Sequence, residues 1–314
     1  MPRLIDCPQA EAIDLATLVD MLETQGLDWR DEDEFASWGP ALKQLGNNRT
    51  FLADLMIDEL KQRCDGQVRE NQYSAQVIML ATKSRDFMMR ANLWPAAQDT
   101  VVRQSGTDPF FYGVPHDHNF SFLTVGYLGP GYWSDYYEFD YDQVVGYPGE
   151  PVDLRFVEKA RLEQGKVMLY RAHKDIHLQL PADSLSVSLN IVATGHCTAF
   201  RDQYRFDLDS GTISGIMTRT SLEPMLMLAA HHGGGNGLDL VDQFAGHHPS
   251  DRVRWAALRA RAGAAASLDD RIAILEEGTR SSSRLIAEMA RQAVDKLKRG
   301  RSWIEAAPVL EAAA

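Results

Sequence analysis

Two histidines two positions apart, His116 and His118, are the residues of this chain best suited to chemistry. They stand just before an apolar stretch, residues 120–127, whose composition favours a β-strand. In extended backbone, residues i and i+2 point to the same side, so both imidazoles can reach one metal ion. Imidazole suits iron, zinc, copper and nickel, and catalytic metal sites keep positions open for substrate. The pair therefore predicts a metal site, with Asp117 pointing away into a hydrogen bond or salt bridge.

A third histidine, His177, lies in a second stretch with strand character. A glycine-led apolar run, residues 165–170, comes before it, and residues 184–192 come after it with polar and apolar side chains in alternation. His173, four residues earlier, is the competing ligand. Because His173 lies in a turn-like segment, we expect His177 to complete the metal site. A pair of strand histidines without a metal, one buried and one exposed, is the alternative.

The two segments resemble the sequence motifs of the cupin superfamily. The first is His-x-His preceded by a glycine, here Gly113, and the second is a glycine-led strand, a turn, a histidine and an alternating strand. Within that superfamily, His-Asp-His and Asp-Ile-His are similar to the motifs of cysteine dioxygenase-type thiol dioxygenases. The resemblance covers residues 71–220. It implies a β-barrel that binds ferrous iron through His116, His118 and His177, with no carboxylate ligand and with O2 as co-substrate.

The chain departs from these motifs at three positions. Phe122 and Leu123 stand where cupins with a carboxylate ligand place a glutamate, and where some thiol dioxygenases place a cysteine. Asn190 stands where a histidine is often found beside the metal ligands. These departures leave the substrate open, a thiol included. They also leave the metal open, because zinc, nickel or manganese in the same site would support isomerisation, decarboxylation or hydrolysis without O2.

Tyr170 and Arg90 are the candidate catalytic residues beside the metal ligands. Tyr170 is on the strand that leads to His177 and could hydrogen-bond a ligand. A buried guanidinium could hold a substrate carboxylate through two hydrogen bonds, and Arg85 and Arg103 are the alternatives to Arg90 for this role.

The position of Glu138 depends on strand register. A Gly-Pro-Gly turn at residues 128–132 predicts a hairpin, and pairing across it brings Glu138 opposite Phe122 or Leu123. One register places the carboxylate near the histidines, and a slip of one residue turns it outward. We expect a structural or exposed glutamate. The aromatic residues around this turn predict barrel core and wall, with a cavity lining as the alternative.

The remaining sequence predicts helices on both sides of the barrel. Residues 1–70 show helical spacing of apolar side chains, so we expect a helical N-terminal segment packed on a barrel of residues 71–220. A second hairpin is expected at residues 207–212. Residues 221–314 predict an all-α domain, which resembles HEAT-type repeats or forms an ordinary bundle. The expected fold is α+β, with a mainly antiparallel jelly-roll barrel of cupin type.

The composition excludes several function classes. Hydrophobic residues make up 45% and charged residues 24% of the 314 residues, as in an ordinary globular protein. The net charge of −12 disfavours phosphate backbones, so we expect no nucleic-acid partner. We expect no signal peptide and no membrane association, because no apolar run approaches ~18 residues. Three widely spaced cysteines are typical of a reducing cytoplasm.

The sequence thus favours a cytoplasmic mononuclear non-haem iron(II) oxygenase or dioxygenase. Three neutral ligands leave the charge of the iron uncompensated, which favours a small anionic or peptide-type substrate bound directly to the metal together with O2. A non-oxidative metal enzyme and a metal-binding sensor are the alternatives. The C-terminal helices favour a homo-oligomer or a protein partner. Five residues with four glycines, Gly233–Gly237, predict a flexible linker within them.

Overall fold

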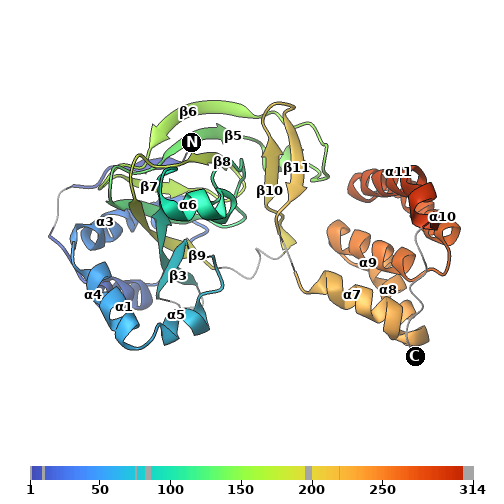
Figure 1. Cartoon of the computed structure of the whole chain (residues 1–314), viewed down its shortest axis with the longest axis horizontal. Coiled ribbons are helices and arrows are strands. Elements are labelled where there is room, and N and C mark those ends of the chain that lie inside the picture. Colours follow the sequence, from blue (N-terminus) through green and yellow to red (C-terminus); the bar gives the residue numbers. More distant parts are fainter. Residues whose placement is uncertain are drawn as a thin grey trace. The chain divides into compact units, whose positions relative to one another are not determined.

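A computed structural model of the chain describes residues 2–8, 11–74, 76–81, 86–194, 200–218 and 220–306. The chain divides into two units, residues 1–144 with 151–217, and residues 145–150 with 218–314. The first unit holds the β-strands with helices α1–α6, and the second holds helices α7–α11 (Figure 1).

The strands of the described residues are β1 (Arg3–Ile5), β2 (Val77–Ala81), β3 (Phe87–Trp94), β4 (Phe122–Leu128), β5 (Trp133–Glu138), β6 (Arg155–Arg161), β7 (Val167–Tyr170), β8 (Asp175–Leu180), β9 (Ser186–Ala193), β10 (Tyr204–Asp207) and β11 (Thr212–Ile216). The helices are α1 (Leu15–Gln25), α2 (Glu32–Ser37), α3 (Gly39–Asn47), α4 (Phe51–Lys61), α5 (Asp65–Glu70), α6 (Thr100–Ser105), α7 (Leu222–His232), α8 (Gly234–His247), α9 (Asp251–Gly263), α10 (Leu268–Gly278) and α11 (Arg284–Ala306). Two short 3-10 helices are η1 (Asp108–Phe110) and η2 (Tyr141–Gln143).

Two antiparallel sheets form the first unit. One sheet has the strand order β1-β7-β4-β9-β3-β2, and the other is built from β6-β5-β8 and the hairpin β10-β11. A bridge through His116 links β8 to β10, because this residue pairs with His177 on one side and with Arg205 on the other. The fold is therefore the α+β fold with a mainly antiparallel cupin-type jelly roll that the sequence predicts.

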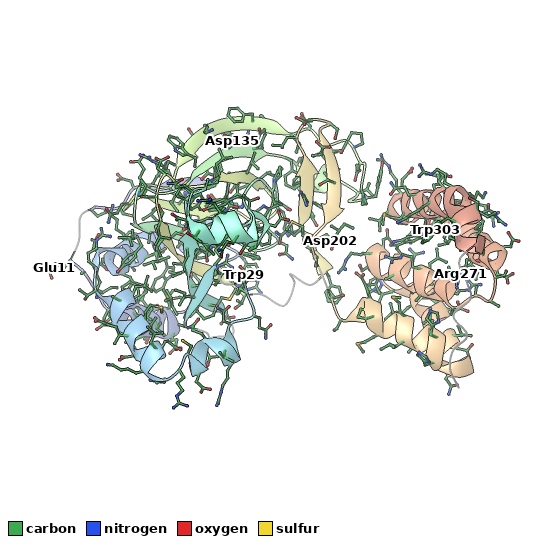
Figure 2. All side chains as sticks on the ribbon, viewed as in Figure 1. Glu11, Trp29, Asp135, Asp202, Arg271 and Trp303 are labelled. Atoms are coloured by element: carbon green, nitrogen blue, oxygen red, sulfur yellow. The ribbon has the colours of Figure 1, made fainter. Side chains whose placement is uncertain are left out.

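Both faces of the six-stranded sheet are buried, and the two faces differ in kind. All eight residues of β9 are buried, although its side chains alternate between polar and apolar. The apolar set, with Leu189 and Ile191, packs against the N-terminal helices. The opposite face of the sheet packs against the second sheet, where Tyr136 of β5 and Tyr170 of β7 are both in the core. Side chains project from both faces of the strands (Figure 2).

The N-terminal segment covers the outer face of the six-stranded sheet. Helix α3 packs on β4, β7 and β9, and Gly46 lets it approach closely, since a Cβ there would lie 3.3 Å from Val125. The Asp14 side chain caps α1 by accepting a hydrogen bond from the backbone N–H of Thr17. The segment is not wholly helical, because residues 3–5 form the edge strand β1, which pairs with β7.

The hairpin predicted at residues 128–132 is wrong. Strand β4 lies between β7 and β9 in one sheet, whereas β5 lies between β6 and β8 in the other, so the turn is a corner at which the chain changes sheets. Gly129 and Gly131 have φ of +79° and +86°, and a Cβ on either would lie within 2.3 Å of a backbone carbonyl oxygen. The second predicted hairpin is present, with β10 and β11 joined at residues 208–211.

Strand β3 was not expected, because residues 92–94 read as irregular sequence. It runs through eight residues and pairs along its whole length with β9. Its polar residues Arg90 and Asn92 alternate with Met89 and Ala91, so one side of the strand is polar and yet buried. A polar buried side resembles a loop in sequence, which is why periodicity did not reveal the strand.

The helical unit has two small cores that share helix α9. Helices α7, α8 and α9 pack around Val241 and Ala257, and helices α9, α10 and α11 pack around Leu275 and Ala290. The predicted cap at Ser267 is present, with its hydroxyl accepting from the backbone N–H of Asp270. The likeness to HEAT-type repeats stays a prediction.

Residues 145–150 belong to the helical unit, although they come from the middle of the barrel sequence. Val145 packs against the core formed by α9, α10 and α11. Arg284 donates a hydrogen bond to the hydroxyl of Tyr147 over 3.1 Å. The segment is therefore tied to the helices by both apolar and polar contacts.

The flexible linker predicted at Gly233–Gly237 is wrong, because α8 begins at Gly234. These glycines allow α7 and α8 to touch at their junction. A Cβ on Gly237 would lie 2.1 Å from the carbonyl oxygen of Ala229, and one on Gly233 would lie 2.5 Å from the same atom. Close backbone contact, and not disorder, accounts for the glycines.

Gly237→Ala should therefore destabilise the helical unit. A methyl group overlapping the Ala229 carbonyl forces α7 and α8 apart, which costs about 1–3 kcal/mol. Gly246→Ala is the matched control, since it lies in the same helix with nothing within 4 Å of its Cβ position. The control should leave the protein equally stable or more stable by about 0.5–1 kcal/mol. Urea unfolding followed by circular dichroism measures both, and equal effects would contradict the contact.

Candidate metal centre

The backbone places His116 directly opposite His177. The N–H of His116 donates to the carbonyl of His177 over 3.2 Å, and the N–H of His177 donates back over 3.0 Å. This reciprocal pair joins two segments that are 61 residues apart in the chain. Residues facing each other in such a pair have side chains on the same side of the sheet, so both imidazoles point inward.

The other edge of the same segment is fixed by Asp117 and Pro115. The N–H of Phe206 donates to the carbonyl of Pro115 over 2.9 Å, and the Asp117 carboxylate accepts from the N–H of Tyr204 over 2.6 Å. Asp117 is fully buried and points away from the imidazoles. Burial raises the pKa of this carboxyl to about 8. Asp117 thus has the structural hydrogen bond that the sequence predicts.

The Nε2 atoms of His116, His118 and His177 converge. The Nε2 of His177 lies 3.1 Å from that of His118 and 3.2 Å from that of His116. Nitrogens bound to one ion at about 2.0–2.1 Å in adjacent positions are separated by about this distance. The three residues form a group able to hold a metal ion, and all three are buried.

The protonation of the three imidazoles suits a metal. The Nδ1 of His116 donates to the carbonyl of Val114 over 2.7 Å, which leaves the lone pair on Nε2. Burial lowers the pKa of His116 to about 4, and it lowers the pKa of His118 and of His177 well below the ordinary value. Near neutral pH the ligands are therefore uncharged, as metal binding requires.

His173 lies outside this group. Its backbone has φ of +60°, its ring packs on Tyr141, and its Nδ1 is 3.8 Å from the carboxylate of Asp117. The ring is therefore on the outer side of the ligand-bearing segment. The structure brings together the histidine triplet that the sequence favours, with His177 as its third member.

Glu138 is a structural residue of the second sheet. It is the last residue of β5, and it forms ion pairs with Arg155 of β6 and, over 3.0 Å, with Arg171. Neither register considered from the sequence applies, because β5 does not pair with β4. The carboxylate does not line the cavity described below.

Tyr170 supports the site from behind. Its ring stacks on Phe122 with centroids 4.4 Å apart and meets the ring of His177 edge-on at 5.0 Å. Its hydroxyl is hydrogen-bonded to that of Tyr136 over 2.9 Å. Tyr170 is not among the residues that line the cavity, so it contacts a metal ligand and not the open space. A catalytic role for it stays a prediction.

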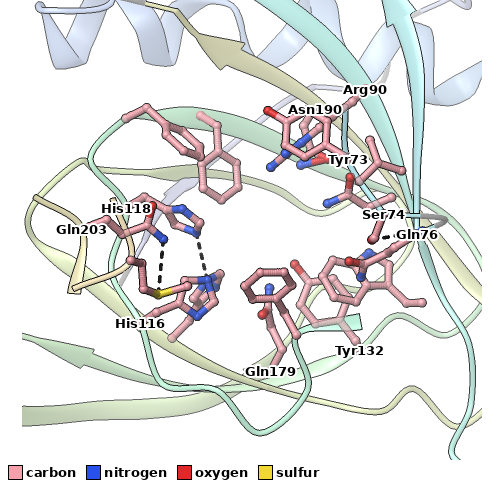
Figure 3. Close-up of a pocket in the computed structure, with 18 residues that line it drawn as sticks. Tyr73, Ser74, Gln76, Arg90, His116, His118, Tyr132, Gln179, Asn190 and Gln203 are labelled. Atoms are coloured by element: carbon pink, nitrogen blue, oxygen red, sulfur yellow. Dashed lines mark hydrogen bonds between the residues drawn. The ribbon is translucent and has the colours of Figure 1, made fainter. Parts of the chain in front are cut away.

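A cavity of about 300 Å³ opens beside the three histidines. Figure 3 shows His116 and His118 on one side of it and Arg90 and Asn190 on the other. Aromatic side chains, among them Phe120 and Phe122, form part of its wall. This is the volume of a site for a small molecule.

The structure distinguishes the three candidate arginines. Arg90 lines the cavity and is 8% exposed, and its guanidinium lies 4.9 Å from the ring centre of Tyr73. Burial lowers its pKa. Arg103 is exposed on α6, and Arg85 lies outside the described residues. Within the described part of the chain, no carboxylate forms an ion pair with Arg90.

Three amide residues of the cavity were not identified as site residues from the sequence. They are Asn92 on β3, Gln179 on β8 and Asn190 on β9, and each is more than nine-tenths buried. A usable signal was present, because Gln179 is two residues after His177 and Asn92 is two residues after Arg90. Residues at that spacing in a strand share a face.

The comparisons with known proteins are distant. No protein-family model matches the chain, and no curated protein does. A structure of DMSP lyases matches 38% of this chain and 47% of its own, at 12% identity and a TM-score of 0.24. A salicylate 1,2-dioxygenase from Pseudaminobacter salicylatoxidans matches 44% of this chain and 33% of its own, at 8% identity and a TM-score of 0.26.

A cupin domain from Bordetella pertussis Tohama I matches 40% of this chain and 100% of its own, at 11% identity and a TM-score of 0.22. The chain spans less than half the length of the lyase and of the dioxygenase. At these values, function has to be argued from the site itself. Within the described residues, no helix is long and apolar enough to span a bilayer.

Replacing any one of His116, His118 and His177 by alanine should sharply reduce bound metal, because two nitrogens remain where three converge. The loss should exceed the about 10–100-fold in affinity that outer partners of metal ligands contribute. Metal content of anaerobically loaded, desalted protein measures this, with circular dichroism to check the fold. His173→Ala is the control and should retain metal. Retention in His177→Ala with loss in His173→Ala would contradict the ligand assignment.

Proposed function

We propose that the protein is a mononuclear non-haem iron(II) oxygenase that acts on a small anionic substrate bound at the metal. The observation that carries the proposal is the convergence of three uncharged imidazole nitrogens on a cavity that also holds a buried guanidinium. A ferrous ion held there would supply one-electron chemistry and open coordination positions for substrate and O2. The residues of the chain would bind, orient and shield the reactants.

Charge in the cavity favours an anion. The three histidines contribute no charge, so a divalent ion keeps its full +2, and Arg90 adds a positive charge. No aspartate or glutamate is among the residues that line the cavity. An anionic group would compensate this charge, either on the metal or through the fork of N–H groups on Arg90.

The aromatic wall would exclude water and position the ligands. Phe122 contacts His118 edge-on with ring centroids 5.0 Å apart, and Phe120 lies 4.8 Å from the same ring. Tyr170 packs on His177 from the side away from the cavity. These contacts hold the imidazoles in one orientation, and the enclosed volume favours a small substrate over a peptide.

The same donor set could hold zinc, nickel or manganese and catalyse a reaction without O2. It could also serve a metal-binding sensor whose helices contact a partner. Both alternatives share the metal and the cavity, and they differ from the oxygenase only in the steps after substrate binding. The experiment must therefore report on oxygen chemistry and not on metal content alone.

Nitric oxide, a stable surrogate for O2, should bind the ferrous protein under anaerobic conditions and give an electron paramagnetic resonance signal. An anionic substrate on the metal should change that signal and strengthen the binding, because it compensates the charge left by three neutral ligands. Small organic acids, thiols and amino acids can be screened by this change. Stoichiometric zinc without iron, and no response to nitric oxide after loading with iron, would refute the oxygenase.

Arg90→Gln should weaken binding of an anion while leaving metal content unchanged, since Arg90 lines the cavity on the side away from the histidines. Loss of a charge-assisted contact predicts about tenfold or more in Kd. Arg103→Gln removes an exposed arginine of α6 and should have no effect. Equal binding by both variants, measured by calorimetry, would contradict an anion site at Arg90.

A further inference from the structure

Four polar atoms in the cavity wall have no hydrogen-bond partner within the described part of the chain. They are Nε of Arg90, Oδ1 of Asn92, Oε1 of Gln179 and Oδ1 of Asn190. The side chains that carry them are only 8%, 8%, 5% and 2% exposed. Because folded proteins rarely leave buried polar groups unpaired, four such atoms around one cavity indicate hydrogen bonds that a bound molecule completes.

Strand pairing gathers these four side chains. Arg90 on β3 is directly opposite Asn190 on β9, and Asn92 comes two residues after Arg90 on the same face. The Asn190 amide is fixed at one end by the hydroxyl of Thr124 over 3.1 Å, which leaves its other end for the cavity. Gln179 reaches the cavity from β8, two residues after His177, so it lies beside the histidines.

The unpaired atoms identify the groups that a ligand must carry. An amide can present either its oxygen or its nitrogen, since the two are assigned from the hydrogen bonds around them. A hydroxyl both donates and accepts, so it can satisfy each amide in either orientation. An ammonium group fits less well, because no carboxylate lines the cavity and both the metal site and Arg90 are positive.

We propose that the substrate is a small hydroxylated organic acid. Its carboxylate compensates the positive charge of the cavity, and its hydroxyls pair with the amides of Asn92, Gln179 and Asn190. The inference rests on the proposed function for the metal pole and adds the substrate class. A hydrocarbon chain of the same length would leave the amides unpaired, which is the basis on which polar sites reject analogues that lack a hydroxyl.

The test uses full-length protein loaded with zinc, which binds the same nitrogens and has no redox chemistry. Calorimetry would compare two matched sets of ligands, namely threonate with butanoate and threitol, and gluconate with hexanoate and sorbitol. Within a set, the three molecules share chain length and differ in hydroxyls or in the carboxylate. At least one hydroxy acid should bind about tenfold or more tightly than both of its partners.

Asn92→Leu and Asn190→Leu should each remove most of that preference and leave metal content unchanged. Asn190→Asp keeps the side-chain size and should weaken binding of the hydroxy acid by about tenfold or more, through charge repulsion. Gln143→Leu, at an exposed position of η2, is the matched control and should bind like the parent. Circular dichroism and metal content show that each variant is folded.

The proposal is overturned if neither hydroxy acid binds, if the alkanoates bind as tightly, or if the leucine variants keep the preference. Those results would leave the oxygenase standing, because zinc-loaded protein does not report on O2. Conversely, selective binding of hydroxy acids by protein that shows no response to nitric oxide would support this substrate class and refute the oxygenase. The two claims therefore fail separately.

Discussion

The reciprocal backbone pair between His116 and His177 is the constraint on which the site depends. It joins segments 61 residues apart and fixes two imidazoles on one side of the second sheet. His118 is placed at the same-face spacing, so its ring reaches the same point without a further device. The ligand-bearing segment also bridges β8 to β10. Loss of this pairing would therefore disturb the second sheet and the metal centre together.

A second constraint is that the six-stranded sheet is buried on both faces. Its outer face meets the N-terminal helices through apolar side chains, and this contact frees the inner face to carry polar groups. Arg90 and Asn190 can be buried there because they face a cavity and not a packed core. The N-terminal helices thus contribute to function indirectly. They supply the apolar burial that compensates for a polar interior.

The sequence predicted the ligands and not the path of the chain around them. His116, His118 and His177 could be found because i, i+2 spacing is local information. Whether residues 128–132 form a hairpin or a corner depends on which strand pairs with which, and that is decided by distant contacts. The glycines at 233–237 were misread for a similar reason, since their close approach to Ala229 lies in the tertiary structure. The polar side of β3 resembled a loop until the cavity explained it.

X-ray absorption at the iron edge of anaerobically loaded protein tests the central claim most directly. The structure predicts a first shell of nitrogen and oxygen only, with the outer-shell scattering pattern of about three imidazoles at Fe–N distances near 2.0–2.2 Å. Addition of a bound organic acid should change the oxygen part of that shell and leave the imidazoles in place. Fewer than three imidazoles, or a carboxylate of the protein retained in every state, would contradict an all-histidine site.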